Sequence, residues 1–501
     1  MVVIGRWAAT RQRDGTAGAR MSAGQMAGHR TAGRPGQPGT GRGTRTGRSL
    51  WWVSPVGAVM LVVPGTLLLS VRLSDLDFRL FYRVPKAITS SQAALLLAAA
   101  GLLALGALLP ATFAAPRWPR PWPALTPAQL RVLGRSAAVC FRLTTVGYAA
   151  LGLAGVARGA RPAALLAAVR SQSNYSGTLK SEFAPVTGIT TLTQVGIAFV
   201  VIAALLLPYD RSRRLRRQML IVILLGLLRS YLLTERLALL ELLVPLIAVR
   251  AVQLRQASRR AWLLPAAPAM AVPLLLVVFG AFEYSRSWVF FRTRTQQGFP
   301  SFVVNRLAGY YATAYNNGAL QLQYGDRRGR LPYDSLAALW TAPGASQLHL
   351  YDRLSGTSGG TLLATVLNQH GNPEFNNPGG LVVPLIDFGT TGGLLFFLVA
   401  GLAVGLAYRG FRSGEPLGLL LYPVAFTGLL ELPRYVYWTQ GRVTPAVVAL
   451  VVIGLRVRAV GRPARRPRAA PAAAPGPQDA GERDSTLPST APTAAVAAAG
   501  R

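Results

Sequence analysis

A polar stretch late in the sequence combines an imidazole, a carboxylate and several amides within a short span. His370 and Glu374 are four residues apart, and Asn376 and Asn377 come shortly after them, among turn-forming Pro and Gly residues. Such a set can bind the hydroxyl groups of a sugar, and His370 or Glu374 is a candidate general base. The competing interpretation is an ordinary turn before a helix, with Glu374 in solvent.

A series of arginines indicates a second kind of chemistry, the recognition of an anion. Arg229 and Arg236 lie in or beside apolar segments, where an ionised side chain is costly, and Arg286, Arg292 and Arg306 follow in the next polar stretch. A guanidinium keeps its charge and offers a planar fork of donors suited to phosphate oxygens. The alternatives are contact with lipid head groups and ion pairs with the nearby carboxylates, Glu235, Glu241 and Glu283.

Charged residues also occur inside other apolar segments. Asp387 follows Leu385-Ile386 and precedes Phe388-Gly389, so it is either a functional carboxylate or the cap of a break at Gly389. Arg434 lies close to Glu431 and is a candidate substrate-binding residue. The aromatic residues that follow it, Tyr435, Tyr437 and Trp438, suit a belt at the membrane interface or a platform on which sugars stack.

The elements that must position these residues are apolar and long. The chain has 501 residues, of which 51% are hydrophobic and 14% charged, against about 25% charged in soluble domains. Apolar segments near the length of a bilayer-spanning helix predict an all-α polytopic membrane protein with about ten transmembrane helices. They cover 51–71, 91–115, 136–157, 186–208, 218–233, 237–254, 262–282, 379–407, 416–432 and 443–457.

The distribution of arginine predicts the orientation of these helices. The net charge of +35 resides largely in two polar tails and in alternate connections between apolar segments, which the positive-inside rule assigns to the cytoplasm. We therefore expect a bacterial inner-membrane protein with both termini in the cytoplasm, and no nucleic-acid partner. The predicted organisation is a disordered basic arm (1–50), a membrane domain (51–282), a large, partly helical extracytoplasmic loop (283–378), a second membrane domain (379–457) and a disordered Ala/Pro-rich tail (458–501).

Several functional classes lack their motifs. The sequence has no Walker-type phosphate loop and no His-Glu-x-x-His. Only three histidines and one cysteine, Cys140, are present, so neither a His-rich metal site nor an internal disulfide is expected. An ATP-driven pump is therefore not expected, and the sequence predicts neither a cofactor nor a bound metal.

Three stretches, within roughly 190–455, carry a resemblance to a known family. They are the helix–arginine turn–helix pattern of 227–240, the Tyr/Asn-rich 310–318, and the Gly-Gly, Asp387-Phe388-Gly389 and later glycine pattern of 379–408. Together with the large late loop they resemble the oligosaccharide repeat-unit polymerases, the O-antigen polymerase-like family.

The resemblance implies an activity. Such an enzyme transfers a growing glycan from one undecaprenyl-pyrophosphate carrier to the terminal sugar of another, on the outer face of the membrane. Arginines would then stabilise the pyrophosphate, and Glu374, His370 or Asp387 would be the base. Membrane lipids, a flippase and a chain-length regulator are the further candidate partners.

Three other functions compete with this one. A structural or assembly protein of the cell envelope would not depend on individual arginines. A membrane glycosyltransferase that adds single sugars from a lipid-phospho-sugar would use an early acidic motif, for which Asp75 and Asp77 are the candidates. A transporter of lipid-linked glycans would show polar groups at the membrane midplane and internal symmetry between its halves, and neither is visible in the sequence.

Overall fold

Helices account for all the regular structure in the part of the chain that is described. The computed structural model describes residues 50–112, 122–161, 163, 181–184, 186, 188, 190–233, 235–257, 259–288, 291–293, 297–325 and 331–461. No strand occurs among them, so the predicted all-α class is confirmed for these residues. The predicted N-terminal arm up to residue 49, and the tail after residue 461, lie outside the described residues.

Seven helices in the described part are long and apolar enough to cross a membrane. They are α1 (Pro55–Arg72), α3 (Ser90–Thr112), α4 (Pro127–Ala157), α9 (Leu237–Ala257), α10 (Ala267–Glu283, extended at its start by the 3₁₀ turn η4, Arg259–Ala266), α16 (Val383–Ser413) and α18 (Thr444–Gly461). The chain is therefore built as a membrane-embedded helical protein.

The other three predicted segments also form helices, but these fall short of that criterion. They are α7 (Val195–Leu206, preceded by η3, Thr190–Gln194), α17 (Pro416–Glu431) and α8 (Arg213–Leu232). The first two are apolar but short, and α8 begins with arginines. Ten spans thus stay a prediction.

Local sequence signals explain where several helices begin. The Ser54 hydroxyl accepts a hydrogen bond from the Gly57 N–H (3.0 Å) ahead of Pro55, and Thr126 forms a capping box with Gln129 ahead of Pro127. The capping box starts α4 nine residues before its predicted apolar segment. At the other end of the chain, α18 continues to Gly461, past the predicted boundary at 458.

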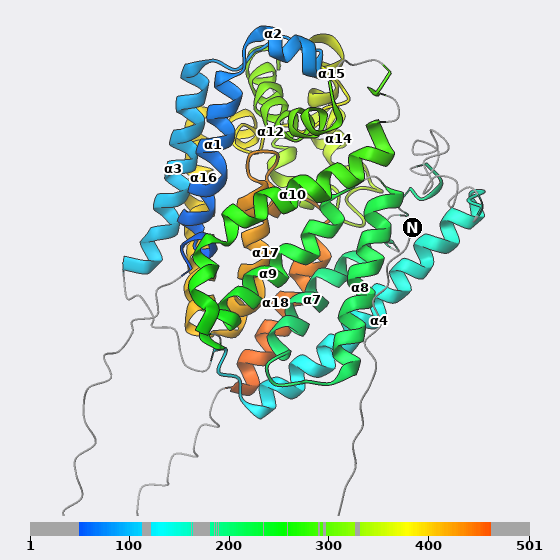
Figure 1. Ribbon diagram of the computed structural model, residues 1–501, viewed down its shortest axis with the longest axis vertical. Helices are drawn as coiled ribbons and strands as arrows, with labels where there is room; N and C mark the ends of the chain where they lie inside the picture. The colour runs from blue at the N-terminus through cyan, green and yellow to red at the C-terminus, as the bar shows by residue number, and fades with distance from the viewer. Residues whose placement is uncertain are drawn as a thin grey trace, which may run out of the picture. The chain divides into compact units, whose positions relative to one another are not determined.

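Small residues allow the central helices to approach closely. A Cβ at Gly401 of α16 would lie 2.1 Å from the Leu103 carbonyl oxygen of α3, and one at Gly106 would lie 2.2 Å from the Leu398 carbonyl oxygen. The two backbones are therefore in direct contact, a mode of packing that glycine permits between membrane helices. Helices α17, α9, α7 and α4 continue the bundle from there (Figure 1).

The segment between α10 and α16 is largely helical, as predicted. It contains η5 (Tyr284–Trp288), α12 (Phe299–Tyr324), η6 (Asp334–Leu336), α13 (Ala337–Trp340), α14 (Leu350–Ser355) and α15 (Thr361–His370). Helix α12 packs against α1, α10 and α15. With α2 (Asp75–Asp77) and the π-helical turn η2 (Phe78–Tyr82), α12 lies at one end of the bundle, the upper end in Figure 1.

Candidate functional site

Two arginines and three aromatic rings, one of which belongs to α12, form a continuous stack. The Arg236 guanidinium lies 3.9 Å from the ring centroid of Phe279 and 5.1 Å from that of Tyr310. The Arg434 guanidinium lies 5.3 Å from the Tyr310 ring and 5.2 Å from the Tyr435 ring. We call these five residues the arginine–aromatic stack. Cation–π contacts of this kind hold the guanidinium planes in place.

A chain of alternating arginines and glutamates runs beside the stack. Glu283, which is fully buried at the end of α10, pairs with Arg236 and lies 3.7 Å from the Arg306 guanidinium. Arg306 also pairs with Glu374, which pairs in turn with Arg83. This row of ion pairs contains three arginines and two glutamates, so its positive charges outnumber its negative charges by one. We call it the outer arginine network, after its predicted position in the membrane.

A second ionic group joins α8, α9 and the start of α18. Arg442 binds the buried Glu241 through two contacts (2.9 and 3.1 Å) and lies 3.5 Å from Glu235. Arg229 lies 3.9 Å from the same Glu235 carboxylate and donates a 2.7 Å hydrogen bond to the Thr193 hydroxyl. In this group the charges balance, because each arginine has a glutamate.

The connection between α17 and α18 links the stack to the segment between α10 and α16. Arg434 is 2.8 Å from Glu431 and donates to the side-chain oxygen of Asn377 (3.3 Å), while its backbone carbonyl accepts from Gly379 N–H (2.9 Å). Further along, the Thr439 hydroxyl donates to the Asp334 carbonyl (3.2 Å). This connection therefore orients groups on both sides of it.

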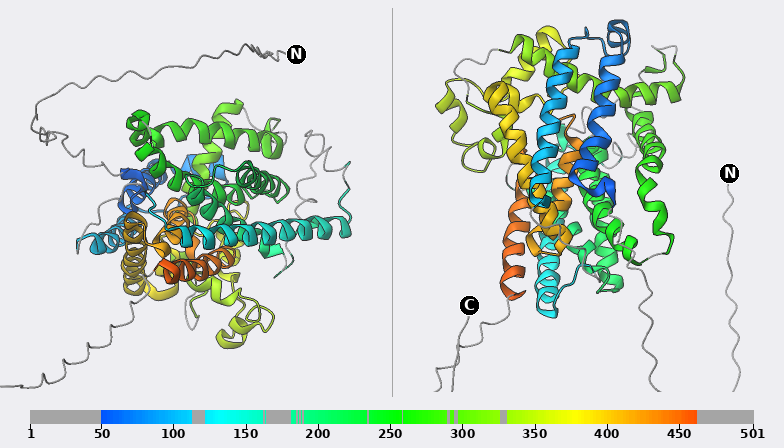
Figure 2. Two further views of the ribbon diagram at one scale, coloured as in Figure 1. Left: turned by 90° about the horizontal axis from the view of Figure 1, so that it is seen from below. Right: turned by 90° about the vertical axis from the view of Figure 1, so that its left-hand side faces the viewer.

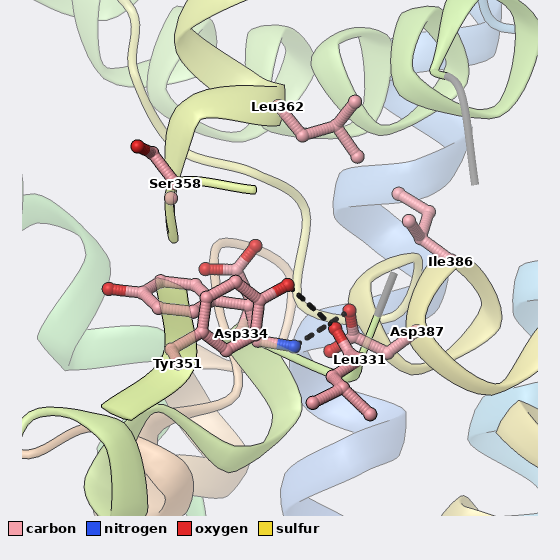
Figure 3. Close-up of a pocket in the computed structure, with 9 residues that line it drawn as sticks. Leu331, Asp334, Tyr351, Ser358, Leu362, Ile386 and Asp387 are labelled. Atoms are coloured by element: carbon pink, nitrogen blue, oxygen red, sulfur yellow. Dashed lines mark hydrogen bonds between the residues drawn. The ribbon is translucent and has the colours of Figure 1, made fainter. Parts of the chain in front are cut away.

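A solvent-open pocket lies where η6 and α14 meet the start of α16 (Figure 3). Its polar lining includes Asp334, Asp387 and Ser358, and Leu331, Leu362 and Ile386 form apolar walls. Asp387 accepts hydrogen bonds from the backbone N–H groups of Ser335 (2.6 Å) and Tyr333 (3.4 Å). Burial, and secondly the charge of Asp387, raises the pKa of Asp334 to about 6.

The three predicted catalytic residues occupy different environments. Glu374 lies in the outer arginine network between Arg83 and Arg306. His370, at the end of α15, stacks on the Tyr324 ring at 3.9 Å. Asp387 lines the pocket, and the backbone breaks from helical geometry two residues later, at Gly389 (φ 72°, ψ 174°). The predicted break is therefore present, and Asp387 also faces a pocket.

The predicted substrate-binding residues divide into two groups. Those with partners brought together by the fold are Arg236, Arg306, Asn377 and Arg434, in and beside the stack, and Arg229, in the separate group with Glu235 and Arg442. The others are Arg292 and Asn376, which are exposed, and Arg286, whose side chain lies outside the described part of the structure. The ion pairs with Glu235 and Glu283 that the sequence raised as an alternative are present.

Two further expectations concern the aspartates Asp75 and Asp77 and the aromatic residue Tyr437. Asp75 binds Arg79 (2.6 Å), and Asp77 accepts from the Ser74 hydroxyl and backbone N–H, which lowers the pKa of both carboxyls. Both aspartates therefore have partners close in sequence, and the acidic-motif alternative stays a prediction. Tyr437 is fully buried, so the expectation of a lipid-facing aromatic belt is wrong for this residue.

Arg442, Asp334 and the stacking role of Tyr310 are not predicted from the sequence. A signal for Arg442 exists in the sequence. Like Arg434, it lies before the last apolar segment, at the opposite end from the arginine-rich tail, where the positive-inside rule predicts few arginines. Asp334 has no such signal, since it stands in a polar stretch without a recognisable motif. Among the described residues, no group of three or more His, Cys, Asp and Glu side chains is arranged to hold a metal ion.

Comparison of the chain with protein-family models, with curated proteins and with solved structures finds no match. The chemistry must therefore be argued from the site itself. Fixed guanidinium groups with a small excess of positive charge are suited to an anion, above all to phosphate oxygens. The pocket at η6 and the start of α16, with two carboxylates and apolar walls, is suited to accepting protons from hydroxyl groups.

Proposed function

We propose that the chain is a membrane glycosyltransferase of the oligosaccharide repeat-unit polymerase type. It would transfer a glycan from one undecaprenyl-pyrophosphate carrier to the terminal sugar of another. The observation that carries the proposal is that Arg236 and Arg434, from separate parts of the chain, flank one tyrosine, Tyr310, while Arg306 lies 3.7 Å from Glu283, the partner of Arg236. A diphosphate bound there would be contacted from several sides.

The proposed topology has ten spans, with both termini in the cytoplasm of a bacterium and the segment 283–378 outside. Arginine-rich stretches support it, because they fall at the ends of helices opposite the arginine–aromatic stack. Four arginines open α8, and Arg458 lies in the last turn of α18. The stack would then face the outer leaflet, where lipid-linked glycans are polymerised.

In the proposed reaction the acceptor hydroxyl oxygen attacks the anomeric carbon of the donor sugar. A new glycosidic bond forms while the bond from that carbon to the pyrophosphate oxygen breaks. Arg236 and Arg434 would stabilise the negative charge left on the pyrophosphate. The hydroxyl proton would pass to a carboxylate, and the pocket offers Asp387 and Asp334 for this role. Glu374 would act differently, by holding Arg306 in position.

Replacing the two stacked arginines one at a time tests the proposal. Because each lost contact to a charged oxygen costs about 1.5–3 kcal/mol, Arg236→Gln and Arg434→Gln should each reduce polymerisation by roughly tenfold or more. Gel analysis of the cell-surface glycan should show single repeat units in place of long chains. Arg213→Gln, an exposed arginine at the opposite end of α8, is the matched control. Normal chain length in both stack variants, at normal protein level, would refute the proposal.

A further inference from the structure

Helix α10 differs from the other candidate spans in how little of it is buried. In its most apolar 18-residue window 11% of the residues are buried, against 28–56% in the other six. Val272 and Leu274 are 57% and 64% exposed. Two residues along a helix correspond to about 200° of rotation, so these side chains point to nearly opposite faces. The middle of α10 therefore has no face packed on the protein.

Both ends of this helical segment are nevertheless held. At the start, the indole N–H groups of Trp51 and Trp52 donate to the carbonyls of Pro265 (3.0 Å) and Leu264 (2.8 Å) in η4. At the other end, Phe279, Gly280 and Glu283 are buried, and Phe279 packs with α12. In Figures 1 and 2, α10 runs at the periphery of the bundle. The exposed middle is thus a fixed element of the fold.

The exposed part of α10 leads directly to the candidate site. Its last residue, Glu283, pairs with Arg236, and Phe279 is the first ring of the arginine–aromatic stack. The outer arginine network there has one positive charge more than its carboxylates neutralise. An apolar face that ends at such a cluster complements a molecule with a long hydrocarbon chain and an anionic head.

We propose that the bundle-facing side of α10 binds the hydrocarbon chain of the polyprenyl pyrophosphate carrier, with its phosphates at Arg236. This inference rests on the proposed function and adds the route by which the carrier reaches the site. The carrier enters sideways from the bilayer between α10 and the bundle, so its chain never leaves an apolar medium. Without the carrier, the bundle-facing side of α10 would contact only bulk lipid.

Photocrosslinking of the full-length protein in its native membrane tests this route. A benzoylphenylalanine is placed at Val272, at Leu274 or at Leu153, a control on α4 that is 72% exposed, and the lipid adducts are identified by mass spectrometry. We expect one of the two α10 positions to capture polyprenyl species, and the other position and Leu153 to capture phospholipid. Adding Arg236→Gln should reduce the polyprenyl adduct roughly tenfold, because the head group loses its charged contact.

The outcomes separate this inference from the proposed function. Capture of phospholipid alone at both α10 positions, or of a second copy of the chain, overturns the lipid route. So does a polyprenyl adduct that Leu153 gives equally. The polymerisation assay is read independently: if Arg236→Gln loses polymer while the α10 positions give no polyprenyl adduct with Arg236 intact, the route is refuted and the proposed function stands.

Discussion

Glu283 is the residue whose replacement tests the electrostatics of the site most directly. Its carboxylate is fully buried and lies between the guanidinium groups of Arg236 and Arg306, which are only 17% and 9% exposed. Glu283→Gln keeps the volume of the side chain but leaves two buried cations facing each other. Removing one partner of a buried ion pair costs about 3–5 kcal/mol, so we expect a loss of stability of that order.

The same variant should gain affinity for an anion. Without the Glu283 carboxylate, inorganic pyrophosphate loses the competitor that lies between the two guanidinium groups, and only the pair of Arg306 with Glu374 remains beside it. A ligand at one hundred times its dissociation constant stabilises the folded state by about 2.7 kcal/mol. Pyrophosphate should therefore restore more than half of the lost stability, and it should raise the melting temperature of Glu283→Gln more than that of the unmodified protein. Thermal unfolding in detergent, with and without pyrophosphate, measures both effects.

Two further variants complete this experiment. Glu415→Gln removes a carboxylate that caps α17 by accepting from Gly418 N–H (2.9 Å) and is not a member of the outer arginine network. It should show no response to pyrophosphate. Glu283→Gln combined with Arg236→Gln should recover part of the stability, because one unpaired cation is gone. Unchanged stability in Glu283→Gln, or an equal pyrophosphate response in Glu415→Gln, would refute the reasoning.

Three other predictions concern separate parts of the molecule. Arg442→Gln leaves the buried carboxylate of Glu241 without its bidentate partner and should destabilise the protein by about 3–5 kcal/mol; adding Glu241→Gln should restore part of this in the same thermal assay. Burial raises the pKa of Asp334 from 3.8 to about 6. The contribution of protonated Asp334 to the free energy of unfolding should therefore be fully present below pH 3.8 and lost as the pH rises through 6, and Asp334→Asn should flatten that pH profile. Gly401→Ala places a methyl group against the Leu103 carbonyl and should cost about 1–3 kcal/mol, visible as a lower melting temperature; an unchanged value would contradict the packing of α3 on α16.

The sequence alone determined the helical class and the approximate course of the chain. Each of the ten predicted apolar segments overlaps a helix, because length and hydropathy are local properties that a continuous stretch carries by itself. The proximity of Arg229 and Glu235 was visible for the same reason, since only a short turn separates α8 from α9. Boundaries set by capping residues rather than by hydropathy, such as the start of α4 at Pro127, were missed.

Only the tertiary structure decided which charged residues meet. Glu374 binds Arg306, 68 positions away, and Arg83, 291 positions away, while Arg442 reaches Glu241 across 201 positions. The hydrophobic periodicity of the sequence does not reveal such pairs, because the attraction between two charges depends on their distance in space and on the loss of water around them. The same reason applies to Asp334, whose raised pKa exists only because the fold buries it and sets it beside Asp387.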